Sequence, residues 1–139
     1  MTAFDDAFTA VVRARGVWRD DTPAAVLERW SSFVVECEHG YRGDEFAYAN
    51  EAMARTTLEA ALTDPGLAEF PELAALRRRV EAVDARFRPL LVEHAFPGID
   101  PDEWWLRGIV QRAGGRLARE WKRSFGFDVE VVRERRPAS

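Results

Sequence analysis

The stretch Thr22–Gly40, TPAAVLERWSSFVVECEHG, decides the fold. Thr22 can cap a helix, and Pro23 suits the first helical turn, where its missing N–H removes no hydrogen bond. Apolar residues then recur at helical spacing until Gly40, the residue type that commonly ends a helix in a left-handed conformation. This apolar face consists of Val26, Leu27, Trp30, Phe33, Val34 and Cys37. We therefore predict a helix whose long apolar face packs against other helices.

Three more segments carry helical patterns. Their expected positions are Thr2–Arg15, Asp44–Leu62 and a segment that begins near Pro71 and breaks or kinks at Pro89. In the second of them, the expected inward residues are Ala47 or Tyr48, Met53, Thr57, Leu58 and Leu62. In the third, spacings of three and four form a heptad seam of Leu73, Leu76, Val80, Val83, Phe87 and Leu90. Such a seam is typical of a helix that lies nearly antiparallel to a neighbour in a bundle.

The C-terminal third predicts a fifth helix followed by a short strand. Asp100-Pro101-Asp102-Glu103 is a strong helix start. The helix would run to Gly126, with a break or a close helix crossing near Gly114-Gly115. Residues 127–133 then alternate as a strand, whose partner could be residues 16–19, a second copy of the chain in a homodimer, or another protein.

Length and composition complete the fold prediction. The 139 residues, 47% hydrophobic and 32% charged, suit one globular domain. We expect an all-α or nearly all-α, single-domain bundle of about five helices with a short C-terminal β-strand over residues 1–133, and a frayed tail over 134–139. No apolar run approaches the ~20 residues of a membrane span. The acidic start resembles no secretory signal and Cys37 is the single cysteine, so we expect a cytoplasmic protein.

Charge is distributed unevenly along the chain. Residues 1–76 hold 14 acidic and 6 basic residues, whereas residues 77–139 hold 10 acidic and 14 basic ones, within a net charge of −4. The basic residues are almost all arginine, which is typical of a chain from a high-GC, bacterial genome. The unevenness either reflects solvated helix faces that differ by chance or marks surfaces for charged partners.

Residues that could carry catalysis are sparse. Glu36 and His39 stand three apart on a helix, the spacing of carboxylate-bridged di-metal bundles, but the second half of such a site is missing. We therefore expect no metal, leaving Glu36 and His39 as weak candidate ligands, and no other cofactor. Cys37 continues an apolar stripe and is expected to be buried and inert. Phosphate loops and nucleophile elbows are absent from the sequence, which favours a non-enzymatic protein.

Asp84 borders the heptad seam and therefore needs a cationic partner. Arg55 and Arg88 are the candidates, and an ion pair that locks two helices is the expected role.

Two surfaces could bind partners. An acidic segment with aromatic residues suits a basic protein. Of the adjacent Trp104 and Trp105 only one can point inward, so the other should lie at a rim or a pocket mouth. The candidate partner-binding residues are Glu38, Tyr41, Asp44, Glu45, Tyr48, Trp104 and Trp105. A basic stripe along the fifth helix is the candidate for nucleic-acid phosphate, and consists of Arg112, Arg116, Arg119 and Arg123.

The function predicted from these features is a non-enzymatic protein-binding or regulatory domain, in its most concrete form an immunity or antitoxin-like inhibitor of a basic partner. The alternative is a small enzyme or a ligand- or metal-binding bundle, with a site near Glu36 and His39 or near Trp104 and Trp105. The second alternative is nucleic-acid binding through the basic stripe. A membrane partner is not expected.

Overall fold

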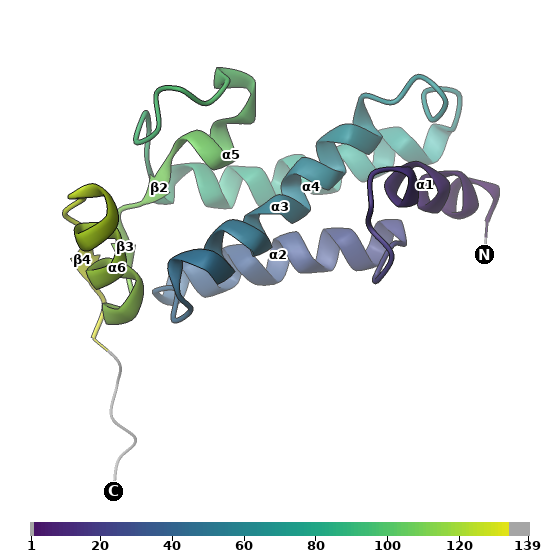
Figure 1. Cartoon of the computed structure of the whole chain (residues 1–139). Helices are drawn as coiled ribbons and strands as arrows, with labels where there is room; N and C mark the ends of the chain where they lie inside the picture. Colours follow the sequence, from purple (N-terminus) through teal and green to yellow (C-terminus); the bar gives the residue numbers. More distant parts are fainter. Residues whose placement is uncertain (1, 134–139) are drawn as a thin grey trace, which may run out of the picture.

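The computed structural model describes residues 2–133 and shows a mostly helical single domain, as predicted (Figure 1). The helices are α1 (Ala3–Ala14), α2 (Pro23–His39), α3 (Glu45–Leu62), α4 (Pro71–Phe87), α5 (Trp104–Arg107) and α6 (Gly115–Phe125). Two 3-10 turns are η1 (Arg88–Leu90) and η2 (Pro101–Glu103). The strands are β1 (Leu91–Val92), β2 (Ile109–Val110), β3 (Arg112–Ala113) and β4 (Glu130–Val131).

Helices α2, α3 and α4 form the long body of the bundle (Figure 1). Helix α1 covers one end of this body, and α6 with the short strands lies at the other end. None of the helices within residues 2–133 is long and apolar enough to cross a membrane. Within residues 2–133, all strands and both 3-10 turns follow α4, from Arg88 onward.

The helix starts follow the capping chemistry read from the sequence. The Thr22 hydroxyl accepts a hydrogen bond from the Ala25 amide, with Pro23 as the first helical residue. The Asp44 carboxylate accepts one from the Ala47 amide at 2.7 Å. These contacts confirm the predicted starts of α2 and α3.

The core of the bundle is rich in aromatic side chains. Trp30 on α2 is fully buried, and its ring lies 5.0 Å from that of Phe87 on α4 in an edge-to-face contact. The inward prediction for Met53 was wrong, because 45% of that residue is exposed. The buried side of α3 instead consists of Tyr48, Ala52, Ala54, Arg55, Leu58, Ala61 and Leu62. The inward face of α3 thus combines three alanines with larger side chains.

The predicted fifth helix is not one helix, and the break expected near Gly114-Gly115 is present. The chain forms η2 and α5, leaves the helix at Gly108, and starts α6 only after Gly114. At Gly108 a Cβ atom would lie 2.9 Å from the Val92 carbonyl oxygen, and at Gly114 one would lie 2.7 Å from that of Tyr41. Both glycines therefore allow the intervening residues to run close to backbone elsewhere in the chain.

The two small sheets explain the segment between α5 and α6. β2 pairs antiparallel with β1, and β3 pairs in parallel with β4, with Ala113 opposite Val131. The strand predicted over 127–133 is therefore real but shorter, and it pairs with β3 rather than with residues 16–19. The predicted frayed tail, residues 134–139, lies outside the described residues.

Candidate functional site

An apolar groove opens between α3, α5, α6 and the loop before η2, with a volume of about 500 Å³. We use the name apolar groove for the hollow lined by Glu45, Phe46, Tyr48, Ala49, Asn50, Ala52, Met53, Phe96, Ile99, Trp105, Leu106, Gly108, Ile109, Trp121 and Phe125. Its walls come from α3 on one side and from residues 96–125 on the other. The chain breaks between α5 and α6, and both of these helices contribute to the second wall.

Three large apolar side chains at the apolar groove face solvent. Phe46 is 84% exposed, Phe125 is 53% exposed and Met53 is 45% exposed. Scattered exposed apolar residues are common on proteins, but several of them around one hollow mark a binding surface. The groove is therefore the strongest candidate site among the described residues.

The floor and walls of the apolar groove are held by defined contacts. Trp105 donates a hydrogen bond from Nε1 to the Thr56 hydroxyl at 2.9 Å, and the Arg55 guanidinium lies 4.5 Å from its ring centroid. The Phe96 ring makes edge contacts with those of Phe125 and Phe127. The groove thus has a shape before anything enters it, which lowers the entropy cost of binding.

Charge at the apolar groove is acidic. Glu45 is the one charged side chain in its lining, and it accepts a hydrogen bond from the Ser124 hydroxyl at 3.0 Å. Asp100 and Asp102, which follow the lining residue Ile99 in the chain, are exposed. A cationic flank on a ligand would therefore meet favourable charge here.

The structure divides the predicted partner-binding residues into two sets. Tyr41, Tyr48 and Trp105 are buried, at 2%, 6% and 1% exposure, so none of them forms the exposed aromatic patch that was predicted. Glu38 forms an ion pair with Arg86 at the surface. Of the predicted residues, Glu45, Tyr48 and Trp105 border the apolar groove.

Asp44 and Trp104 lie away from the apolar groove. The Asp44 carboxylate caps α3 and is also 3.3 Å from the Arg116 guanidinium. Trp104 is half-buried under Arg88, whereas its neighbour Trp105 points inward. The expectation that one of the two tryptophans points inward and the other lies at a rim agrees with this placement.

The phenol groups of the two tyrosines, Tyr41 and Tyr48, both have a raised pKa. Burial raises the pKa of the Tyr48 phenol well above its usual range. Burial, and then the hydrogen bond to the Glu51 carboxylate, raise the pKa of the Tyr41 phenol as well. Both phenols are therefore protonated and uncharged in the folded protein, and their role is structural.

From the raised pKa of the two tyrosines we predict that the free energy of unfolding falls at alkaline pH. A raised folded-state pKa means that the unfolded chain releases these protons first, so the stabilisation is complete below about pH 10 and is lost as pH rises further. We expect no phenolate absorbance from the folded protein at about pH 11, where free tyrosine is mostly ionised. The absorbance should rise only together with loss of helical circular dichroism. Phenolate formation in a protein with full helical signal would contradict this.

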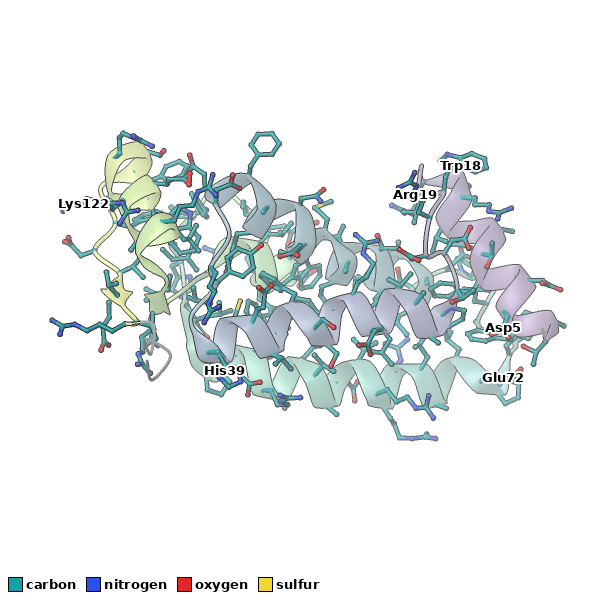
Figure 2. All side chains as sticks on the ribbon, turned by 90° about the horizontal axis from the view of Figure 1, so that it is seen from below. Asp5, Trp18, Arg19, His39, Glu72 and Lys122 are labelled. Atoms are coloured by element: carbon teal, nitrogen blue, oxygen red, sulfur yellow. The ribbon has the colours of Figure 1, made fainter. Side chains whose placement is uncertain are left out.

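The Glu36 and His39 pair does not gather into a cluster. Both side chains are exposed at the end of α2, and Figure 2 shows His39 at the surface. Within residues 2–133 no group of three or more His, Cys, Asp or Glu side chains is arranged to hold a metal ion. Cys37 is buried at 4% exposure, and burial, more than its acidic neighbours, raises the pKa of its thiol, which agrees with the expected inert role.

The basic stripe is not continuous. Arg112 lies on β3 rather than on a helix, and its guanidinium is 3.5 Å from the Glu130 carboxylate. Arg116 contacts Asp44 and Glu120. Acidic side chains of the same chain therefore already pair with two of the four arginines, which leaves less positive charge for nucleic-acid phosphate.

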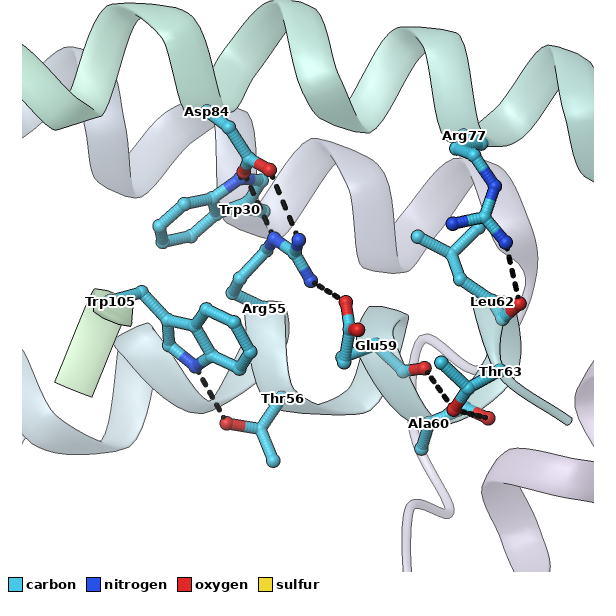
Figure 3. Close-up of polar contacts among 10 residues, drawn as sticks. All are labelled: Trp30, Arg55, Thr56, Glu59, Ala60, Leu62, Thr63, Arg77, Asp84 and Trp105. Atoms are coloured by element: carbon cyan, nitrogen blue, oxygen red, sulfur yellow. Dashed lines mark hydrogen bonds and ion pairs between the residues drawn. The ribbon is translucent and has the colours of Figure 1, made fainter. Parts of the chain in front are cut away.

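The buried ion pair predicted for Asp84 is present (Figure 3). Arg55 donates to both carboxylate oxygens of Asp84 at 2.9 and 3.0 Å, and Trp30 Nε1 donates to the same carboxylate at 3.0 Å. The partner is thus Arg55 on α3, whereas Arg88 stacks on Trp104. This network joins α2, α3 and α4 and is structural.

Sequence reasoning missed most of the apolar groove. Its principal exposed residues, Phe46, Met53 and Phe125, are apolar residues within helices, and periodicity alone assigns such residues to a core. A usable signal was helical spacing, since Phe46 and Tyr48 stand two positions apart and therefore point to nearly opposite sides of the helix. Comparisons with protein-family models, with curated proteins and with solved structures found no match.

Proposed function

We propose that the protein is a non-enzymatic binding domain whose apolar groove receives an amphipathic helix of a basic partner protein. The observation that carries this proposal is the exposure of Phe46, Met53 and Phe125 around one preformed hollow. Large exposed apolar patches are unfavourable in an isolated protein and are typical of surfaces that become covered.

The form of the apolar groove favours a helical segment. On α3, Phe46, Ala49, Asn50 and Met53 follow helical spacing along one side of the groove, and Phe125 stands on the other side. A helix laid in such a groove places its own apolar residues, three and four apart, between these walls. The backbone hydrogen bonds of a helix are satisfied within it, so an apolar wall imposes no polar cost.

Charge favours a basic partner. Glu45 lies in the apolar groove, the exposed Asp100 and Asp102 follow its lining residue Ile99 in the chain, and among the described residues no Lys or Arg side chain lines the groove. Lysine or arginine flanking the apolar face of the incoming helix would be attracted to these acids. An immunity or antitoxin-like inhibitor acting in the cytoplasm is the most concrete form of this proposal.

A small apolar ligand is the second candidate. The groove volume of about 500 Å³ lies within the usual range of small-molecule pockets. Native mass spectrometry of the purified protein distinguishes the two candidates, because a retained small molecule adds a defined mass.

The test places a photo-crosslinking amino acid at position 46 in the native host and identifies what it captures. The same amino acid at Trp18 is the control, because Trp18 is 70% exposed and lies at the opposite end of the molecule from Lys122 on α6 (Figure 2). We expect a protein captured from position 46 alone. The crosslinked peptide should be an amphipathic, basic helix.

Affinity of the purified partner then tests the apolar groove directly. We expect Met53→Asp to weaken binding at least tenfold, because it buries a charge against the apolar segment, whereas Trp18→Ser leaves the affinity unchanged. Equal effects of the two substitutions, or binding of an acidic segment, would refute the proposal. The folded state of each variant is checked by circular dichroism.

A further inference from the structure

A second, smaller hollow of about 200 Å³ lies between η1 and α5. Trp104 borders this hollow, whereas the adjacent Trp105 borders the apolar groove. We call it the arginine hollow, after Arg88 and Arg107 in its wall. His94 and Glu93 complete its polar lining, and the proposed protein-binding function does not use it.

Arg88 is held in place by an aromatic ring. Its guanidinium carbon lies 3.7 Å from the centroid of the Trp104 ring. Such stacking uses the flat face of the guanidinium and leaves the N–H groups at its edge able to donate. Within residues 2–133 the Arg88 guanidinium forms no ion pair with a carboxylate, so no acid among these residues neutralises its charge directly.

Arg107 presents a buried donor without an acceptor. Its Nε atom is inaccessible to solvent, and no hydrogen-bond partner for it exists in the described part of the chain. A buried N–H group that lacks an acceptor is unfavourable, so such groups are rare in folded proteins. Arg107 also has no carboxylate partner among residues 2–133, unlike Arg55, which donates three hydrogen bonds to Asp84 and Glu59.

We propose that the arginine hollow binds a small molecule through an oxyanion group, either a phosphate or a carboxylate. Two arginine side chains that have no acid partner within residues 2–133 line one small space, and a guanidinium group can donate two parallel N–H bonds to such a group. His94, whose backbone has a positive φ of 66°, adds a third potential donor at the wall. The volume admits the oxyanion with a few attached atoms and excludes a polymer.

Nearby acids set the selectivity of the arginine hollow. Glu93 is the one acid in its lining, and its side chain is 73% exposed and 3.9 Å from the His94 imidazole. Asp100 and Asp102 flank Pro101 at the rim, and the Asp100 carboxylate accepts from the Asp102 amide. Because these acids weaken the long-range attraction, binding depends on hydrogen bonding to the two arginines rather than on net charge.

The test follows the Arg107 Nε–H signal by NMR while inorganic phosphate, or in a separate arm acetate, is added at constant ionic strength against chloride. The buried Nε–H exchanges slowly with water and can be observed directly. We expect a saturable shift of this signal and none of the Arg55 Nε–H, which already donates to Asp84. The arm that saturates at the lower concentration identifies the oxyanion.

Matched variants decide between a site and diffuse attraction. We expect Arg88→Gln to weaken binding at least tenfold, and Arg79→Gln, which removes the same charge from the exposed side of α4, to leave it unchanged. Arg88 is exposed, so its loss should not unfold the protein. The absence of a saturable shift, or equal weakening by both variants, would overturn the proposal.

Discussion

Replacing Asp84 by alanine lowers the free energy of unfolding by about 3–5 kcal/mol, the usual effect of removing one partner from a buried ion pair. Asp84 and Arg55 are each 6% exposed, and the carboxylate accepts hydrogen bonds from both Arg55 and Trp30. Its removal leaves the Arg55 cation with Glu59 alone, whose side chain is 40% exposed. Urea unfolding monitored by circular dichroism measures the loss.

The Arg55→Met, Asp84→Leu double variant provides the control for this prediction. It removes both charges and fills the space with apolar atoms, so only the Trp30 N–H is left unpaired, at about 1–3 kcal/mol. We therefore expect the double variant to be more stable than Asp84→Ala. If Asp84→Ala unfolds within about 1 kcal/mol of the unmodified protein, the network is not the structural link described here.

Substitution of the adjacent glycines by alanine should have opposite effects. At Gly114 the added Cβ would lie 2.7 Å from the Tyr41 carbonyl oxygen, which also accepts the Gly114 N–H at 2.9 Å. Backbone cannot move aside cheaply, so we expect a loss of about 2–3 kcal/mol. At Gly115 the closest atom is a terminal nitrogen of Arg119, which can rotate away.

Gly115→Ala is therefore the matched control, and we expect it to stabilise the protein by about 0.4–1 kcal/mol through reduced freedom of the unfolded chain. Thermal or urea unfolding of the two variants side by side measures the difference. Two variants of equal stability would show that β3 and α6 do not meet the chain at Tyr41 as described.

The helices of the body were predictable because their signals are local. Thr22, Pro23 and Gly40 delimit α2 within one stretch of sequence, and the structure places its ends there. The Arg55–Asp84 pair was predictable for a different reason, since an acid on a buried seam needs a cation within reach.

The C-terminal third was not predictable because its signals are long-range. Gly108 ends α5 where the chain approaches Val92, and Gly114 precedes α6 where it approaches Tyr41, and these contacts lie outside any local sequence window. The pairing of β4 with β3 also depends on these contacts, because β3 lies between the two glycines. The apolar groove is lined by α5 and α6, which the sequence predicted as parts of one helix. Its walls and the exposure of Met53 therefore could not be derived from periodicity.

Helix α5 has one aromatic ring at each hollow. The rings of Trp104 and Trp105 meet edge to face, with centroids 5.7 Å apart. Because both tryptophans belong to the same four-residue helix, a rotation of α5 moves both rings. Any ligand that rotates α5 while filling one hollow will therefore change the affinity of the other, and thermodynamic linkage requires that the second ligand act on the first by the same factor.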